Sequence, residues 1–176
     1  MRKVLAAVVL LVFAPSTIAA AGDISALLGL VPGERAPFVI KPFSPGTPFG
    51  VFRLPTPSPR LAQIFFDLEF MVLNESGRVV GVGAKRAFPG KQQCEDAQRT
   101  VRALLAQAFE AKYPGPDSRW QYQSADGAIT AGAYCSFSDG TPYPVLQMDI
   151  THTKTNDDVL KHFRKVPANP AVERAR

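Results

Sequence analysis

Hydrophobic and polar residues alternate with a period of two in the middle of the chain. Between Gln63 and Leu73 the apolar positions are Ile64, Phe66, Leu68, Phe70 and Val72, with Asp67 and Glu69 on the other face. This pattern predicts a half-buried strand. Asn74 to Gly77 favour a turn, and Arg78 to Phe88 resumes as a second strand, so an antiparallel hairpin is expected. Gly81 and Gly83 in the second strand predict close approach of a helix or of the proline-rich arm rather than a ligand site.

The apolar spacing changes to three and four residues between Lys91 and Tyr113. The apolar positions there are Cys94, Ala97, Val101, Leu104, Leu105, Ala108 and Phe109. This spacing predicts one long amphipathic helix, which ends at Pro114-Gly115-Pro116.

Three strands and a helix are expected after the long helix. The strands are Trp120–Ser124, Ala128–Phe137 after the Asp126-Gly127 turn, and Val145–Thr151, which together form a meander. Asn156 is the expected N-cap of a closing helix, Asp157–Val166. Residues 167–176 are expected to be a disordered tail.

These elements predict an α+β fold. An antiparallel sheet, formed by the hairpin and the three-strand meander, packs against the long amphipathic helix within a single domain at 61–166. Residues 22–60 form a short helix at 24–30 and an extended arm, since eight of the chain's 16 prolines lie between Pro32 and Pro59. Proline fixes φ and lacks an N–H donor, so regular sheet is not expected in the arm. Its phenylalanines and aliphatic residues predict that it lies across the domain.

Residues 1–21 have the pattern of a cleaved signal peptide. Arg2 and Lys3 precede the apolar run Val4–Ala14, and small residues follow at Ala19 to Ala21. The run is too short to span a bilayer, and no cysteine follows for lipid attachment. We therefore expect a periplasmic or secreted protein with no membrane anchor after cleavage. A buried N-terminal helix is the alternative.

Composition and charge change this picture little. The 176 residues are 46% hydrophobic and 20% charged, which is typical of a globular domain. Removing the signal peptide lowers the net charge of +5 by two, and much of the remaining excess lies at the C-terminus. The chain also lacks interleaved aromatic and basic residues, so nucleic-acid binding is not expected.

Cys94 and Cys135 are predicted to form a disulfide. They occupy the apolar face of the long helix and the inward face of a strand, in a chain expected to be exported. Such a bond would stabilise the fold by about 4 kcal/mol in the chain-entropy model. The alternatives are a redox pair or a catalytic thiol, but the Cys-x-x-Cys spacing is absent.

Two pairs of side chains, one of carboxylates and one of a histidine with a carboxylate, are further candidates for catalysis. Asp67 and Glu69 share a strand face and could act as paired carboxylates, whereas His152 and Asp149 could act as base and orienting group. Ordinary surface positions account for both pairs more simply. With two histidines and two cysteines in the chain, neither a metal nor a cofactor is expected.

Five aromatic residues suggest a binding surface. These are Tyr113, Trp120, Tyr122, Tyr134 and Tyr143, residue types that are enriched where proteins bind partners. The alternative is ordinary core and sheet packing.

The sequence therefore favours an exported, non-enzymatic domain that binds a protein or a cell-envelope component. A small hydrolase that uses Asp67 and Glu69 or His152 and Asp149 is the alternative, and a homodimer through the arm and a sheet edge is a third hypothesis.

Overall fold

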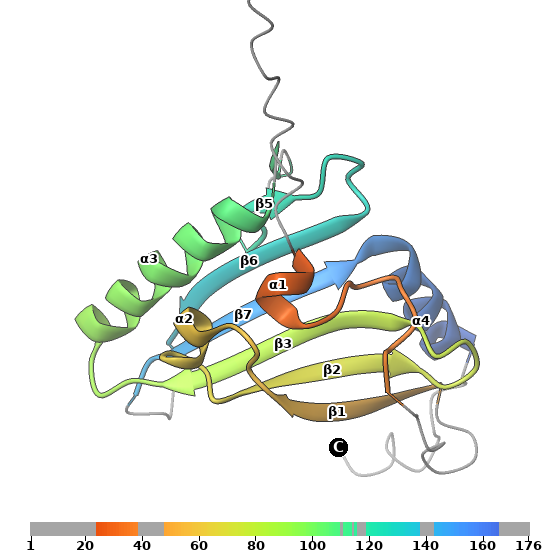
Figure 1. The fold of residues 1–176 in the computed structure, drawn as a ribbon, viewed down its shortest axis with the longest axis horizontal. Coiled ribbons are helices and arrows are strands. Elements are labelled where there is room, and N and C mark those ends of the chain that lie inside the picture. The colour runs from red at the N-terminus through yellow and green to blue at the C-terminus, as the bar shows by residue number, and fades with distance from the viewer. Residues whose placement is uncertain are drawn as a thin grey trace, which may run out of the picture.

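A computed structural model describes residues 24–38, 48–109, 111–113, 115, 119–137 and 143–165. A seven-stranded, fully antiparallel sheet forms its centre, in the order β1-β2-β3-β7-β6-β5-β4 (Figure 1). The strands are β1 Phe49–Pro55, β2 Asp67–Leu73, β3 Val79–Ala87, β4 Ala111–Lys112, β5 Tyr122–Gln123, β6 Ile129–Ser136 and β7 Val145–His152. The predicted signal peptide and C-terminal tail lie outside the described residues.

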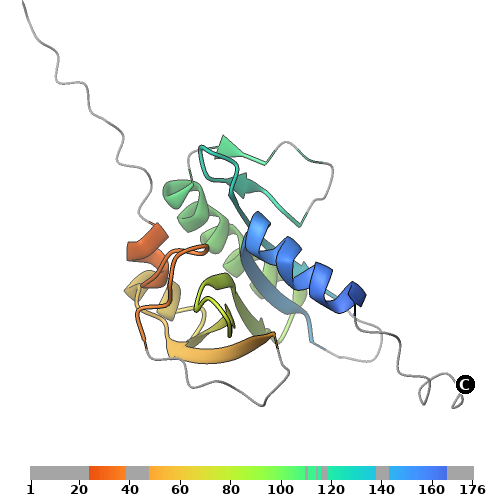
Figure 2. The same ribbon diagram turned by 90° about the vertical axis from the view of Figure 1, so that its right-hand side faces the viewer.

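Helices cover both faces of the sheet. The long helix α3, Lys91–Ala108, lies on one face with the short helices α1, Ile24–Leu28, and α2, Pro59–Ala62. The C-terminal helix α4, Thr153–Lys165, lies across the other face against β3 and β7 (Figure 2). The predicted α+β fold is confirmed. No helix in the described part of the chain has both the length and the apolar character needed to cross a membrane.

The core lies between the sheet and α3. Alternate residues of the central strands point into it, and β7 contributes three fully buried side chains, Leu146, Met148 and Ile150. Helix α3 contributes a stripe of its own, Cys94, Val101, Leu104, Leu105 and Ala108. Burial of each large apolar side chain stabilises the fold by roughly 1.5–3 kcal/mol, so this layer holds the helix to the sheet.

Strand β2 begins four residues later than the sequence pattern predicts. Ser58 caps the four-residue helix α2, and the carbonyl of Leu61 then accepts the N–H groups of Ile64 and Phe65. The chain is therefore turning at this point, and Ile64 and Phe65 are both buried. Phe66 consequently faces solvent with 77% of its surface exposed, rather than sharing the buried face of Leu68 and Phe70.

The expectation that the proline-rich arm contains no regular sheet is wrong for residues 49–55. They form β1, which pairs with β2 over its whole length. Pro48 and Pro55 bound the strand, and no proline interrupts it. The Asn74 N–H donates to the Pro48 carbonyl, and the Thr56 N–H donates to the Phe66 carbonyl. Even-numbered positions along β1 therefore form the hydrogen-bonded pairs with β2, and the N–H positions of odd-numbered residues face away from β2. Pro55 therefore faces the outer edge, where its missing N–H costs no ladder bond.

Both long helices differ from prediction at one end. Helix α3 ends at Ala108 because Phe109 is extended, and Ala111–Lys112 then forms β4. Helix α4 begins at Thr153, so Asn156 lies within its first turns instead of capping it. The predicted hairpin at 63–88 and the β6 and β7 strands of the meander are otherwise found near their expected positions.

The predicted disulfide is present. Cys94 in the first turns of α3 bonds to Cys135 near the end of β6, with the two Cα atoms 6.2 Å apart. Cys94 is fully buried. The bond therefore fastens the helix to the sheet across the core.

Asp126 stabilises the β5–β6 turn as a carboxylate. The Ser124 hydroxyl donates to Asp126 Oδ1 at 2.5 Å and the Ala128 N–H donates at 3.0 Å, and these bonds lower the pKa of Asp126 from its usual range. The turn is exposed, so we expect Asp126→Ala to lower the free energy of unfolding at neutral pH by at most about 1 kcal/mol. A lowered pKa means that this contribution is complete above the unfolded-state pKa and disappears as pH falls through the folded-state pKa. Urea unfolding of both proteins should therefore give a difference that shrinks below about pH 4, and a constant difference would contradict the assignment.

Candidate functional site

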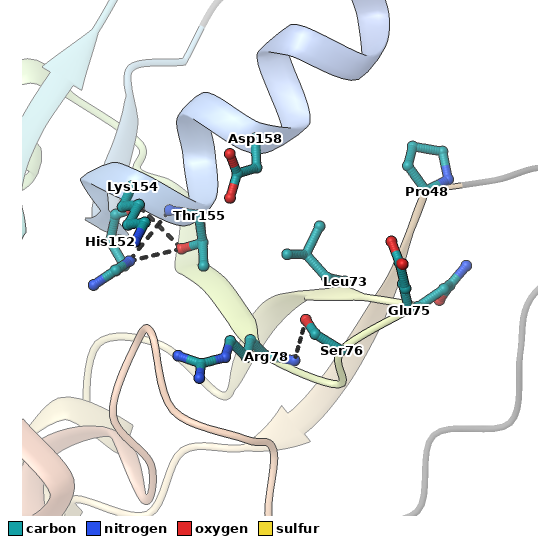
Figure 3. A pocket seen from close by; sticks show the side chains of 10 residues that line it. Pro48, Leu73, Glu75, Ser76, Arg78, His152, Lys154, Thr155 and Asp158 are labelled. Atoms are coloured by element: carbon teal, nitrogen blue, oxygen red, sulfur yellow. Dashed lines mark hydrogen bonds between the residues drawn. The ribbon is translucent and has the colours of Figure 1, made fainter.

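A cleft of about 690 Å³ opens at the end of the sheet where α4 begins (Figure 3). Its walls come from the start of β1, the β2–β3 turn and the first turns of α4. The residues that line it are Pro48, Leu73, Asn74, Glu75, Ser76, Arg78, His152, Lys154, Thr155 and Asp158. These segments meet because β3 pairs antiparallel with β7, so the start of β3 lies beside the end of β7.

The β2–β3 turn forms one wall and is fixed by several hydrogen bonds. Gly77 adopts a φ of 66°, and its N–H donates to the carbonyl of Leu73 at 2.8 Å. The Arg78 N–H donates to Ser76 Oγ at 3.3 Å, and the Asn74 N–H donates to the Pro48 carbonyl at 3.0 Å. Only glycine adopts this φ at low cost, so the turn presents Glu75 and Ser76 in a defined conformation.

His152 forms the opposite wall by capping α4. Its Nδ1 accepts the N–H of Thr155 at 3.3 Å and lies 2.9 Å from the Thr155 hydroxyl, which donates to the His152 carbonyl at 3.1 Å. Thr155 is the third residue of the helix, so the imidazole occupies the role that an N-cap side chain usually fills. Because Nδ1 accepts a hydrogen bond, we assign the proton of the neutral ring to Nε2.

The loop after α1 contacts two of the residues that line the cleft, His152 and Arg78. Gly33 has a φ of 92°, and a Cβ added to it would lie 2.6 Å from the His152 ring. The Gly33 carbonyl accepts a hydrogen bond from Arg78 Nη1 at 3.1 Å. The loop therefore holds both His152 and Arg78 in position, and a side chain at residue 33 would displace the ring.

The cleft combines an apolar floor with charges of both signs. Leu73 and Pro48 supply the apolar surface. In Figure 3 the basic side chains of Arg78 and Lys154 lie toward one side, with Glu75 toward the other and Asp158 on the α4 wall. Asp158 also lies 3.5 Å from Lys161, as an exposed pair that contributes little to stability. Such a site suits a ligand that carries both charges beside an apolar group.

A second hollow of about 230 Å³ lies on the sheet face beside α4. Gly81 and Gly83 form part of its floor, and Glu69, Asp149 and Asn156 are among its polar residues. A Cβ on Gly81 would lie 2.7 Å from the Ile150 carbonyl oxygen, so the close approach at this glycine comes from the neighbouring strand.

The residues of the two candidate catalytic pairs are not brought together in one hollow. His152 lines the cleft, whereas Asp149 lines the second hollow and accepts a hydrogen bond from the Tyr134 hydroxyl at 2.9 Å. Glu69 forms an exposed ion pair with Arg53 at 2.5 Å. Asp67 is exposed at the start of β2 and lines neither hollow.

The five predicted aromatic residues do not share one surface. Tyr122 packs against the core, whereas Tyr134 points to the opposite face of the sheet, where its hydroxyl reaches Asp149. Tyr113 and Trp120 are half-buried beside β4 and β5. Tyr143 is 53% exposed and lies just before β7.

Metal ligands and known relatives give no further indication of function. Among the described residues, no three His, Cys, Asp or Glu side chains gather closely enough to hold a metal ion. The chain matches no protein-family model, no curated protein and no solved structure. The candidate site is therefore interpreted from its own residues.

Sequence reasoning considered His152 but not the other residues of the cleft. Arg78, Glu75 and Lys154 lie in a turn and at a helix start, where charged residues are common. The one local signal was the Asn74–Gly77 turn. It indicated a tight reversal, but not that α4 would lie beside it.

Proposed function

We propose that this chain is an exported, non-enzymatic domain that binds a protein component of the cell envelope or its surroundings. The cleft between the β2–β3 turn and α4 is the proposed binding site, and its occupant is a short extended segment of the partner. The observation that carries the proposal is the size and lining of this cleft. A volume of about 690 Å³ falls within the range of ligand sites, and the lining combines apolar side chains with charged groups of both signs.

A peptide suits this lining better than a uniformly charged ligand. Glu75 and Asp158 would attract a basic side chain, Arg78 and Lys154 an acidic one, and Leu73 with Pro48 would contact an apolar one. A polyanion such as nucleic acid would meet the two carboxylates unfavourably. The cleft walls are preorganised by the His152 cap and the Arg78–Gly33 bond, which reduces the ordering cost of binding.

Binding is preferred to hydrolysis because neither candidate catalytic pair shares a hollow. His152 uses Nδ1 to cap α4, and Asp149 accepts the Tyr134 hydroxyl on the other sheet face. Glu69 is engaged by Arg53. Periplasmic or extracellular location remains part of the proposal and is supported by the disulfide and by the N-terminal sequence pattern.

Photo-crosslinking in intact cells tests the proposal. A photoreactive amino acid in place of Ser76 should give a saturable adduct with a protein, whereas the same amino acid in place of Ala103, on the exposed side of α3, should not. Asp158→Lys should reduce the adduct about tenfold, because a basic group of the partner would meet a like charge. Asp157→Lys is the matched control, since Asp157 is exposed on α4 and does not line the cleft.

Further results test whether the cleft is the binding site. Gly33→Ala should also weaken the adduct, because its Cβ would displace the His152 ring from the cleft wall. Equal adducts from positions 76 and 103, or equal effects of the two lysine substitutions, would contradict the cleft as the binding site. Thermal unfolding of each variant establishes that the fold is retained.

A further inference from the structure

Four aromatic side chains lie at the end of the sheet opposite the cleft. They are Phe66, Phe88, Phe137 and Tyr143, which we call the aromatic end. Phe66 precedes β2, Phe88 follows β3, Phe137 follows β6 and Tyr143 lies two residues before β7. The pairing of Ala87 and Ser136 with Val145 places these strand ends side by side, near the point where β3 leads into α3 (Figure 1).

The rings protrude to an unusual degree for apolar side chains. Phe66 is 77% exposed, Phe137 57% and Tyr143 53%, while Phe88 is half-buried. None of the four lines the cleft or the second hollow. Phe66 lies between α2 and β2, Phe88 between β3 and α3, and both Phe137 and Tyr143 between β6 and β7. A concentration of exposed apolar side chains at one end of a domain indicates an interaction surface.

Two cations accompany the rings. The Arg86 guanidinium carbon lies 5.6 Å from the Phe66 ring centroid and 5.2 Å from that of Phe88, and the Lys91 ammonium lies 6.0 Å from that of Phe137. Arg86 Nη1 also donates to the carbonyls of Gln63 and Ile64, which fixes the segment that carries Phe66. No carboxylate in the described part of the chain forms an ion pair with Arg86.

We propose that the aromatic end docks reversibly on the surface of an anionic lipid membrane. The rings would enter the boundary between headgroups and acyl chains, while Arg86 and Lys91 would contact lipid phosphates. A bilayer interface accepts several protruding rings at once, whereas a protein partner would need a separate pocket for each. The docking surface is distinct from the cleft, so this proposal goes beyond the proposed function and does not depend on it.

Binding is expected to be weak and moderately dependent on salt. Lys91 lies 3.7 Å from Glu95, and Asp67 is exposed next to Phe66, so acidic groups offset part of the positive charge. The apolar contacts therefore supply much of the attraction. We expect an affinity similar to that of a single fatty-acyl chain, which gives reversible membrane association.

Vesicle flotation of the exported protein, with its disulfide intact, tests the proposal. Vesicles of phosphatidylcholine with about 30 mol% phosphatidylglycerol should bind the protein, and vesicles of phosphatidylcholine alone should bind it more weakly. Phe66→Ala and Phe137→Ala should each weaken binding about tenfold. Val51→Ala and Leu160→Ala are matched controls, since these side chains are 46% and 45% exposed elsewhere, and they should leave binding unchanged.

Arg86 needs a separate readout because it also positions Phe66. Arg86→Gln should weaken binding to anionic vesicles by more than it weakens binding to neutral vesicles, whereas a purely positional role would reduce both equally. Lys161→Gln, on α4, is the control for loss of a surface cation.

Absence of binding to both vesicles would overturn the proposal, as would equal losses in the aromatic variants and in the Val51 and Leu160 controls. A saturable protein adduct formed in cells from a photoreactive residue at position 137, without vesicle binding, would assign the surface to a protein instead. None of these results would affect the crosslink from position 76, so the two proposals fail separately.

Discussion

Reduction of the Cys94–Cys135 disulfide is expected to lower the free energy of unfolding by about 4 kcal/mol. The two cysteines are 41 residues apart, so the bond removes much conformational entropy from the unfolded chain. In the folded chain it joins the start of α3 to β6. A loss of this size should lower the melting temperature by roughly 10 °C in a domain of this length.

Thermal unfolding with and without reductant gives the first measurement. The Cys94→Ala, Cys135→Ala double variant separates loss of the bond from other effects of the reductant, and it should be as unstable as the reduced protein. A difference below about 1 kcal/mol would contradict the entropic argument. Thiol labelling of the unreduced, unfolded protein should find no free cysteine, and two labelled thiols would show that the protein lacks the bond.

The double variant should keep its fold at low temperature because other contacts also hold α3 to β6. Gln98 Nε2 and Arg102 Nε of the helix both donate to the Ala133 carbonyl, at 3.0 and 2.9 Å. These bonds lie one and two helical turns beyond Cys94. Docking of the helix therefore depends on the core and these bonds, while the disulfide mainly destabilises the unfolded state.

The periodicity of hydrophobic residues was sufficient to predict which residues are buried in elements that have one buried face. The alternation in β2 correctly placed Leu68, Phe70 and Val72 in the core, and the three- and four-residue spacing in α3 did the same for Val101 and Leu105. In both cases the polar positions face solvent or a half-covered surface. A regular pattern of burial then leaves a regular pattern in the sequence.

The sequence analysis did not predict helix α2 or strand β1. A helix as short as α2 leaves no repeating pattern of hydrophobic residues in the sequence. Helix α2 has four residues, so its turn was interpreted as the start of β2, and Phe66 was assigned to the core. Strand β1 was missed because the density of prolines around it suggested an irregular arm. Its seven residues, Phe49–Pro55, nevertheless contain no proline before the last position. His152 was not considered as a cap because imidazole is not among the usual N-cap side chains.

The candidate site depends on strand pairing and could not be read from any local motif. Arg78 and His152 are far apart in sequence and meet because Gly81 in β3 pairs with Thr151 in β7. The sheet order places the hairpin beside β7 and not beside the first strand of the meander. The sequence predicted the hairpin and the meander, but it did not specify which strands would join them.

The glycines in the strands also show that the sequence did not specify which chain segments come together. The sequence drew attention to Gly81 and Gly83, but among these strand glycines and Gly132 in β6, the least room for a side chain is at Gly132. A Cβ added there would overlap the carbonyl oxygen of Arg119. The Arg119 carbonyl also accepts a hydrogen bond from Gln121 Nε2 at 2.9 Å, and Gln121 Oε1 accepts the Ala133 N–H at 2.8 Å. Gly132 therefore lets the segment before β5 lie directly on β6.

Gly132→Ala is expected to lower the free energy of unfolding by about 3 kcal/mol. The obstructing atom belongs to the backbone, so it cannot rotate away as a side chain could. The 119–123 segment would have to shift, which breaks the Gln121 N–H bond to the Ala131 carbonyl and the pairing of Tyr122 with Ala131. Urea unfolding of the variant and of the unmodified protein measures the difference.

Gly83→Ala is the matched control, because Gly83 also lies within a strand but has room for a side chain. The nearest atom to its added Cβ is Asp149 Oδ1 at 3.6 Å, an ordinary contact. Replacing glycine there reduces the freedom of the unfolded chain, so this variant should be neutral or more stable by about 0.5–1 kcal/mol. If the two substitutions changed the free energy of unfolding equally, this would contradict the close packing of the 119–123 segment on β6. A loss of stability in Gly132→Ala together with a gain in Gly83→Ala would show that this segment depends on a glycine at position 132.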